Sequence, residues 1–257
     1  MNNSFIEFFV IIGMGYFVYF FTRAFIWIHE EQRFSDARKS AIEAFKALFI
    51  GWAAISGLFL LFSLLGISGS NRQEFGLWHV IRQIMLACLF WGPALIVMRR
   101  RRESWSSAGI TKRNIGKSTL LGIILSIFML LYYAATKQVD TGEALRSLSL
   151  SDFWAFLTFL VVGISEEFGF RGYLQTRLIA WLGITWGLVM ASILMAAGHV
   201  VQRMVIMGMP GIDAMVSSLS LIPISLLYGY IMLRTENVVA GTVLHAFIDW
   251  INVVCFP

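Results

Sequence analysis

The sequence predicts an all-α, polytopic membrane protein with about eight transmembrane helices. Of its 257 residues, 58% are hydrophobic and 14% are charged, whereas soluble domains carry about 25% charged residues. The apolar residues also form continuous runs, each close to the ~20 residues that cross a bilayer as a helix. Strands of an outer-membrane barrel would alternate apolar and polar residues instead.

The eight expected spans follow from these runs. They are 5–28, 45–66, 77–98, 116–136, 152–174, 185–203, 215–233 and 237–255. The first is dense in aromatic residues. It is not expected to be a cleaved signal, because no basic region precedes it and it is too long. Spans one to three carry few ionisable residues near their centres, whereas spans five, six and eight carry carboxylates and histidines. We therefore expect accessory helices in 1–104 and the functional core in 105–257, within one folding unit.

The distribution of Lys and Arg predicts the orientation. If the N-terminus lies outside the cytoplasm, 15 of the 20 basic residues fall on the inside and 5 on the outside. The positive-inside rule then places both termini outside. The inside set is Arg23, Arg33, Arg38, Lys39, Lys46, Arg99, Arg100, Arg101, Arg102, Lys112, Arg113, Lys117, Arg171, Arg177 and Arg234. The outside set is Arg72, Arg82, Lys137, Arg146 and Arg203.

The run of four arginines at 99–102 is interpreted as a topology anchor directly after a span, so no nucleic-acid partner is expected. The bilayer itself is the partner that the composition implies. The two cysteines, Cys88 and Cys255, lie in different apolar spans and are expected to be small core residues.

The most informative segment is EEFGFR at 166–171, inside the fifth apolar run. An ionised side chain at the centre of a membrane helix costs roughly 2.5–3.5 kcal/mol, so two adjacent carboxylates indicate function. On a helix Glu166 and Glu167 point about 100° apart. Glu167 and Arg171 have the favourable four-residue spacing for an ion pair. We therefore expect Glu167 to pair with Arg171, leaving Glu166 to face a cavity as a general base.

Two histidines in other spans complete the candidate site. His199 follows the small residues of AAG at 196–198, which allow close approach of another helix. His245 and Asp249 are four residues apart on one face of the last span, and Asn252 continues that face. The structural alternative to catalysis is an ordinary interfacial residue for His199, and helix–helix hydrogen bonding for His245 and Asp249.

These motifs resemble those of the CAAX protease and bacteriocin-processing family, also called the Abi family, which includes the type II CAAX prenyl endopeptidases, or glutamic intramembrane proteases. The family pattern is EExxxR, then FxxxH, then HxxxN or HxxxD, and it resembles EEFGFR at 166–171, AAGH at 196–199 and HAFID at 245–249. The similarity covers roughly 105–255. Met195 stands where the family usually has Phe, and Asp249 where many members have Asn.

The resemblance implies roles for these residues. Glu166 would activate a water with help from His199, while His245 and Asp249 would steady the oxyanion. Glu167 and Arg171 would support the site. An ionised Asp cannot donate a hydrogen bond, so Asp249 is either held protonated or orients His245, in which case Asn252 could supply the amide. The expected activity is an intramembrane endopeptidase that hydrolyses a peptide bond without a covalent intermediate.

Three other functions stay open. Glu166, His199 and His245 could bind zinc as a metalloprotease site with one open position. The absence of HExxH argues against this, and no cofactor is expected. A catalytically silent scaffold or immunity protein would not need so many buried charges. A transporter would show paired broken half-helices, which are not evident.

The substrate expected from the resemblance is a membrane-embedded or lipidated peptide or protein. The size of the chain resembles that of prokaryotic members, so we expect a multi-pass protein of a prokaryotic cell membrane.

Overall fold

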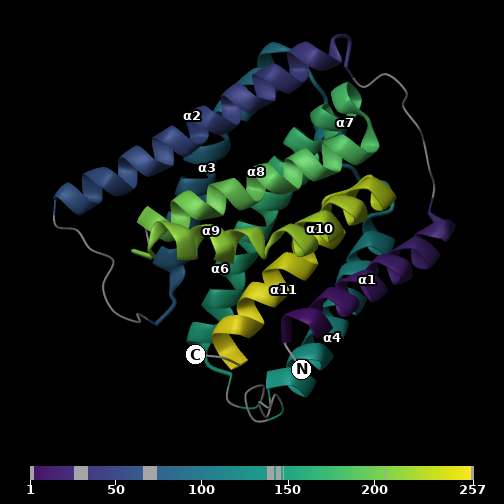
Figure 1. Ribbon diagram of the computed structural model, residues 1–257, viewed down its shortest axis with the longest axis vertical. Helices are drawn as coiled ribbons and strands as arrows, with labels where there is room; N and C mark the ends of the chain where they lie inside the picture. Colours follow the sequence, from purple (N-terminus) through teal and green to yellow (C-terminus); the bar gives the residue numbers. More distant parts are fainter. Residues whose placement is uncertain are drawn as a thin grey trace.

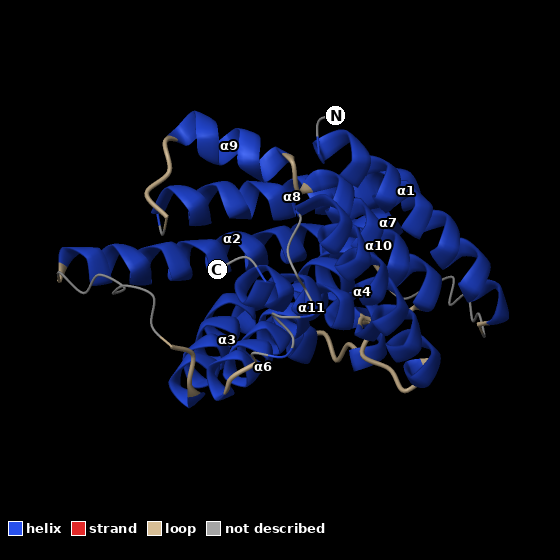
Figure 2. Cartoon of the chain, turned by 90° about the horizontal axis from the view of Figure 1, so that it is seen from below, coloured by secondary structure: helices blue, strands red, loops and turns tan. Residues whose placement is uncertain are grey.

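The computed structural model describes residues 3–25, 34–65, 74–137, 142, 146, 148–205 and 207–255. Within these residues the chain is helical and contains no strand, so the all-α prediction is confirmed (Figure 2). The elements are α1 (Asn3–Phe21), η1 (Thr22–Ala24), α2 (Ala37–Leu64), α3 (Leu77–Arg100), η2 (Trp105–Ala108), α4 (Ile115–Lys137), α6 (Leu150–Glu166), η3 (Glu167–Gln175), α7 (Thr176–Leu182), α8 (Ile184–Val205), α9 (Gly211–Leu219), α10 (Ile222–Thr235) and α11 (Val239–Cys255).

The helix lengths support a multi-pass membrane protein. Six stretches among the described residues are long and apolar enough to cross a bilayer, and two shorter apolar helices, Ile6–Phe21 and Val239–Val254, accompany them. These eight segments correspond to the eight predicted spans. The predicted end of the first span at 26–28, together with Arg33 and Arg72 of the orientation argument, lies outside the described residues.

Two spans differ in detail from the prediction. The fifth is part of a longer helical run, Leu150–Leu182. The predicted span 215–233 is divided into α9 and α10 at Ser220–Leu221. Pro223 lies in the first turn of α10. That is where a residue without an N–H group is tolerated, because the first turn has no intrahelical acceptor for it.

The helices form a central group with one pair on either flank (Figure 1). Helices α2 and α3 pack on each other along one flank, and α1 and α4 lie along the other. Between them lie α6, η3, α8, α10 and α11. Buried side chains form two clusters, one joining α2 and α3 to η3, α7 and α8, and one joining α1 and α4 to α10 and α11. Because residues from both sides of position 104 share the first cluster, the N-terminal helices are part of the packing around η3.

The segment EFGFRGYLQ of η3 is a π-helix of 9 residues, which the sequence pattern did not indicate. π-Helical turns are rare and occur often at functional sites. Two glycines allow its neighbours to approach. A Cβ at Gly169 would lie 1.8 Å from Cζ2 of Trp91 on α3, and one at Gly172 would lie 2.1 Å from the Ala108 carbonyl oxygen. Trp91 and the η2 turn therefore hold η3 in direct contact with the N-terminal half of the chain.

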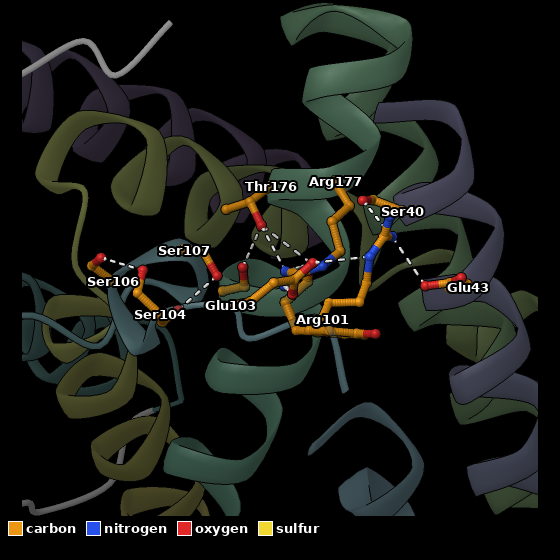
Figure 3. Close-up of polar contacts among 11 residues, drawn as sticks. Ser40, Glu43, Arg101, Glu103, Ser104, Ser106, Ser107, Thr176 and Arg177 are labelled. Atoms are coloured by element: carbon orange, nitrogen blue, oxygen red, sulfur yellow. Dashed lines mark hydrogen bonds and ion pairs between the residues drawn. The ribbon is translucent and has the colours of Figure 1, made fainter. Parts of the chain in front are cut away.

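A buried polar network joins α2, α3 and α7 next to η3 (Figure 3). Arg177 forms an ion pair with Glu103 and donates to the Tyr173 carbonyl oxygen at 2.7 Å. Arg101 donates to Ser40 and Glu43 on α2 at 2.7 and 3.0 Å. Arg177 is 1% exposed, so it is an internal structural residue.

Three residues differ in exposure from what the orientation count and the composition predict. Arg171 and Arg177 were counted among the basic residues of the cytoplasmic side, but both are buried inside the protein. Cys88 was expected in the core and is instead exposed on α3. In Figure 1 the last turns of α1 and α10 and the first turns of α2 and α11, which the orientation argument assigns to one side, all lie toward the right and upper right. The orientation itself stays a prediction.

Candidate active site

The two carboxylates of the EE pair occupy different surroundings. Glu166 ends α6 and its side chain is 23% exposed, whereas Glu167 begins η3 and is 1% exposed. This difference agrees with the expected divergence of neighbouring side chains on a helix. The side chain of Glu166 is therefore partly exposed, whereas that of Glu167 is enclosed.

Glu167 contacts two charged or polar partners from different helices. Its Oε1 lies 3.6 Å from Nη1 of Arg171, so the predicted ion pair is confirmed. The same Oε1 lies 3.2 Å from Nδ1 of His245 on α11. An ionised carboxylate only accepts, so Nδ1 of His245 is the donor. A Cβ at Gly241 would lie 2.5 Å from Glu167 Oε2, which leaves room for the carboxylate only because that residue is glycine.

The other edge of the His245 ring faces two more carboxylates. Nε2 lies 3.9 Å from Glu166 Oε2 and 3.6 Å from Asp249 Oδ2. Both distances exceed that of a direct hydrogen bond. The imidazole thus sits among three carboxylates, with Nδ1 engaged by Glu167. Glu166 Oε2 is itself buried and has no hydrogen-bond partner, which leaves an acceptor available beside Nε2.

His199 lies on α8 and makes a different contact. Its Nδ1 lies 3.0 Å from the Met195 carbonyl oxygen of its own helix. Because a carbonyl oxygen only accepts, Nδ1 carries the proton and Nε2 is free. No direct contact between His199 and Glu166 occurs in the described structure, although His199 lies close enough to Asp249 to interact with it electrostatically. Met195, at the position where the family usually has Phe, is buried in the core.

Asn252 is engaged away from Glu166. Its amide donates to the Ile248 carbonyl oxygen at 3.0 Å, and its side chain is hydrogen-bonded to Tyr133 on α4. The three residues predicted on one face of the last span therefore have different surroundings. His245 and Asp249 lie beside the carboxylates, and Asn252 joins α11 to α4.

Helix α10, which carries none of the three motifs, forms hydrogen bonds with η3 beside the site. Arg171 Nη2 donates to Ser225 at 3.1 Å, and Gln175 Nε2 donates to the Gly229 carbonyl oxygen at 3.0 Å. Glu167, Arg171 and Gln175 follow at intervals of four along η3, and Ser225 and Gly229 follow at the same interval on α10. Such a polar ladder satisfies groups that lipid could not. The signal in the sequence that could have revealed this contact is Gln175, a polar residue four positions after Arg171.

In this arrangement the described residues contain no group of three or more His, Cys, Asp or Glu side chains that could hold a metal ion. The three-ligand set of Glu166, His199 and His245 is thus not gathered as a zinc site here. An apolar pocket of about 480 Å³ lies between α4, α6 and α11 and is lined by Phe156, Phe247 and Trp250 among others. On the helical wheel of α11, Phe247 and Trp250 lie away from His245 and Asp249.

Known proteins resemble the part of the chain that carries this site. The family model described as type II CAAX prenyl endopeptidase, Rce1-like, matches residues 149–251. The matched region runs from α6 into α11 and contains all the motif residues. No curated protein and no solved structure matches.

The match confirms the resemblance drawn from the three motifs: residues 149–251 are similar to the type II CAAX prenyl endopeptidase family. That family is one of membrane proteases, and the apolar helices of the chain support a multi-pass membrane protein.

Proposed function

We propose that this protein is an intramembrane endopeptidase in which Glu166 activates a water molecule to hydrolyse a peptide bond of a membrane-embedded or lipidated substrate. The observation that carries the proposal is the unpartnered oxygen Oε2 of Glu166, 3.9 Å from His245 Nε2. A water within about 2.8 Å of both atoms fits that separation. Such a water would have a carboxylate acceptor on one side and an imidazole on the other.

The chemical step follows from this placement. Glu166 accepts a proton from the water as the water oxygen attacks the carbonyl carbon of the scissile peptide bond. The carbonyl π electrons move to oxygen and form a tetrahedral oxyanion. Collapse of that intermediate re-forms the carbonyl and breaks the C–N bond, and the proton held by Glu166 passes to the departing amine. General acid–base catalysis of this kind contributes about 10²–10⁴-fold to the rate.

Glu167 acts as the positioning residue for His245 in this scheme. Its hydrogen bond to Nδ1 fixes which edge of the imidazole faces Glu166, as the buried aspartate does for the histidine of serine proteases. Arg171 and Ser225 in turn anchor Glu167 and its helix. When it is protonated on both ring nitrogens, His245 donates from Nδ1 to Glu167 and is placed to donate from Nε2 to the developing oxyanion.

Asp249 and His199 complete the proposed site. Because Glu167 already orients His245, Asp249 is not required for that task. We propose that it is neutral when it faces the oxyanion, since a second negative charge there would repel the intermediate. The free Nε2 of His199 supports the water or the substrate carbonyl from α8.

A zinc-dependent protease and a silent scaffold are the competing functions. Zinc would bind through Glu166, His199 and His245 as ligands, and it would require these three side chains to gather more closely than they do in the described residues. Activity that a chelator abolishes and added zinc restores would favour that function. A peptide library in detergent separates a protease from a scaffold when it is tested with the wild type and with Glu166→Ala. A protease cleaves peptides only as the wild type, whereas a scaffold cleaves nothing in either form.

Substrate trapping in native membranes tests the proposal most broadly. Membrane proteomes from cells that express the wild type or Glu166→Gln would be compared, with Glu74→Gln, an exposed site outside the motifs, as the matched control. We expect uncleaved polypeptides to accumulate with Glu166→Gln and to copurify with it. Identical cleavage products in all three membranes would refute the assignment.

A further inference from the structure

An aromatic side chain from α10 lies directly against the proposed oxyanion histidine. The ring of Tyr228 stacks on that of His245, with centroids 5.2 Å apart and planes 16° from parallel. Offset stacking of this kind is a favoured arrangement of aromatic rings. Tyr228 lies outside the three motifs, and nothing in the sequence pattern singled it out.

The surroundings of Tyr228 make it a rigid surface. It is 3% exposed. The Arg171 guanidinium carbon lies 5.2 Å from its ring centroid, which is a cation–π distance. Ser225 and Gly229, its neighbours on α10, accept hydrogen bonds from Arg171 and Gln175 of η3. Tyr228 is therefore held by the same ladder that holds Glu167.

The Tyr228 ring restricts a rotation of the His245 imidazole that the hydrogen bond to Glu167 does not prevent. One contact between His245 Nδ1 and Glu167 fixes an edge of the imidazole, but the ring could still turn about that contact. A flat, immobile face beside the ring blocks this rotation. The direction of Nε2, which lies 3.9 Å from Glu166 Oε2 and 3.6 Å from Asp249 Oδ2, is then determined.

The geometry points to Tyr228 as a positioning residue that sets the plane of the His245 imidazole through its ring face and not through its hydroxyl. The catalytic consequence rests on the proposed function, whereas the ring contact itself does not. A displacement of about 1 Å in a catalytic group can cost about 10²-fold in rate. Tyr228 thus acts on turnover through His245 without touching the substrate.

The test compares three substitutions at one position. Tyr228→Phe keeps the ring face, and Tyr228→Leu and Tyr228→Met remove it at similar bulk. We expect Tyr228→Phe to keep kcat within about 3-fold, and the other two to lower kcat by about 10²-fold with KM changed less than about 3-fold. Tyr230→Leu is the matched control, because Tyr230 lies on the same helix but lines a surface notch with Tyr16 and Tyr19.

A second readout needs no activity. The chain has 4 histidines, so their ring signals can be resolved by NMR on protein labelled at the imidazole carbons, and His245→Gln assigns the relevant one. Ring current from Tyr228 shifts the His245 signal upfield. We expect this shift to persist in Tyr228→Phe and Tyr230→Leu and to vanish in Tyr228→Leu and Tyr228→Met.

The outcomes separate this inference from the function that it serves. Full kcat in Tyr228→Leu, while Glu166→Gln is inactive, would overturn the inference alone. A loss in Tyr228→Phe as large as in Tyr228→Leu would also overturn it, because the hydroxyl would then be the active part. If Tyr228→Leu and Tyr228→Met do not fold, Tyr228→Phe still tests the inference. A changed NMR signal or a lowered kcat in that variant would overturn it. A ring signal that behaves as expected with no turnover dependent on Glu166 would support the contact and refute the function.

Discussion

The contact between Gly169 and Trp91 gives a prediction whose size can be worked out from the structure. In Gly169→Ala the new Cβ would lie 1.8 Å from Cζ2 and 1.9 Å from Cε2 of Trp91, whereas ordinary contacts begin at 3.4 Å. Trp91 cannot turn away, because Phe168 and Phe170 pack edge-on against its ring. Overpacking of a core costs about 1–3 kcal/mol, and occasionally more. We expect at least ~3 kcal/mol here, and a fall in kcat of about 10²-fold because η3 must move.

The assay is unfolding by SDS in mixed micelles, together with turnover. Gly92→Ala is the matched control, since it lies next to Trp91 on α3 and its Cβ would meet nothing within 4 Å. Without a clash, alanine is preferred over glycine in a helix by roughly 0.5–1 kcal/mol, so this control should not be destabilised. Trp91→Leu should relieve the clash, and the cost of Gly169→Ala in that background should fall by more than about 1 kcal/mol. Equal costs in the two backgrounds, or a variant within ~0.5 kcal/mol of the wild type, would refute the reasoning.

Three further predictions concern the buried network, the site and the orientation. Arg177→Met should destabilise the protein by about 3 kcal/mol, the lower bound for breaking a buried ion pair, because Glu103 loses its shorter ion pair and keeps the longer one with Arg101 at 3.8 Å. Arg100→Met on the exposed surface should stay within ~0.5 kcal/mol in the same SDS titration. Asp249→Asn should keep kcat within about tenfold and Glu167→Gln should lose at least ~10²-fold, and the reverse order would show that Asp249 orients His245. In a background without Cys88 and Cys255, Ser104→Cys and Glu74→Cys should react with a membrane-impermeant thiol reagent from opposite faces of the membrane. Glu74→Cys should react in intact cells and Ser104→Cys only after lysis. Labelling of Ser104→Cys in intact cells would show the opposite orientation.

The sequence predicted the features that depend on local periodicity. Continuous apolar runs predicted the helices, and the four-residue spacing predicted the pair of Glu167 and Arg171. The same reasoning placed His245 and Asp249 on one face, where Nε2 and Oδ2 are 3.6 Å apart. These inferences need only the geometry of one helix.

The remaining features depend on contacts between distant segments. The bond from His245 to Glu167 joins residues 78 positions apart, and it arises because Gly241 lets the carboxylate reach α11. The π-helical form of η3 accompanies the contact of Trp91 with Gly169, which no local pattern shows. Arg177 looks like a basic residue of a cytoplasmic segment, and only its ion pair with Glu103 shows that it is internal.

The central claim is that Glu166 is the base that activates water, and the turnover of Glu166→Gln tests it most directly. The measurement is kcat on a peptide identified by trapping, with purified protein in lipid nanodiscs and with the unfolding midpoint recorded for each variant. We predict a loss of at least ~10²-fold, the lower bound of general-base catalysis, at an unchanged midpoint, with Glu74→Gln at wild-type kcat. A Glu166→Gln protein that retains kcat within tenfold of the wild type would contradict the account.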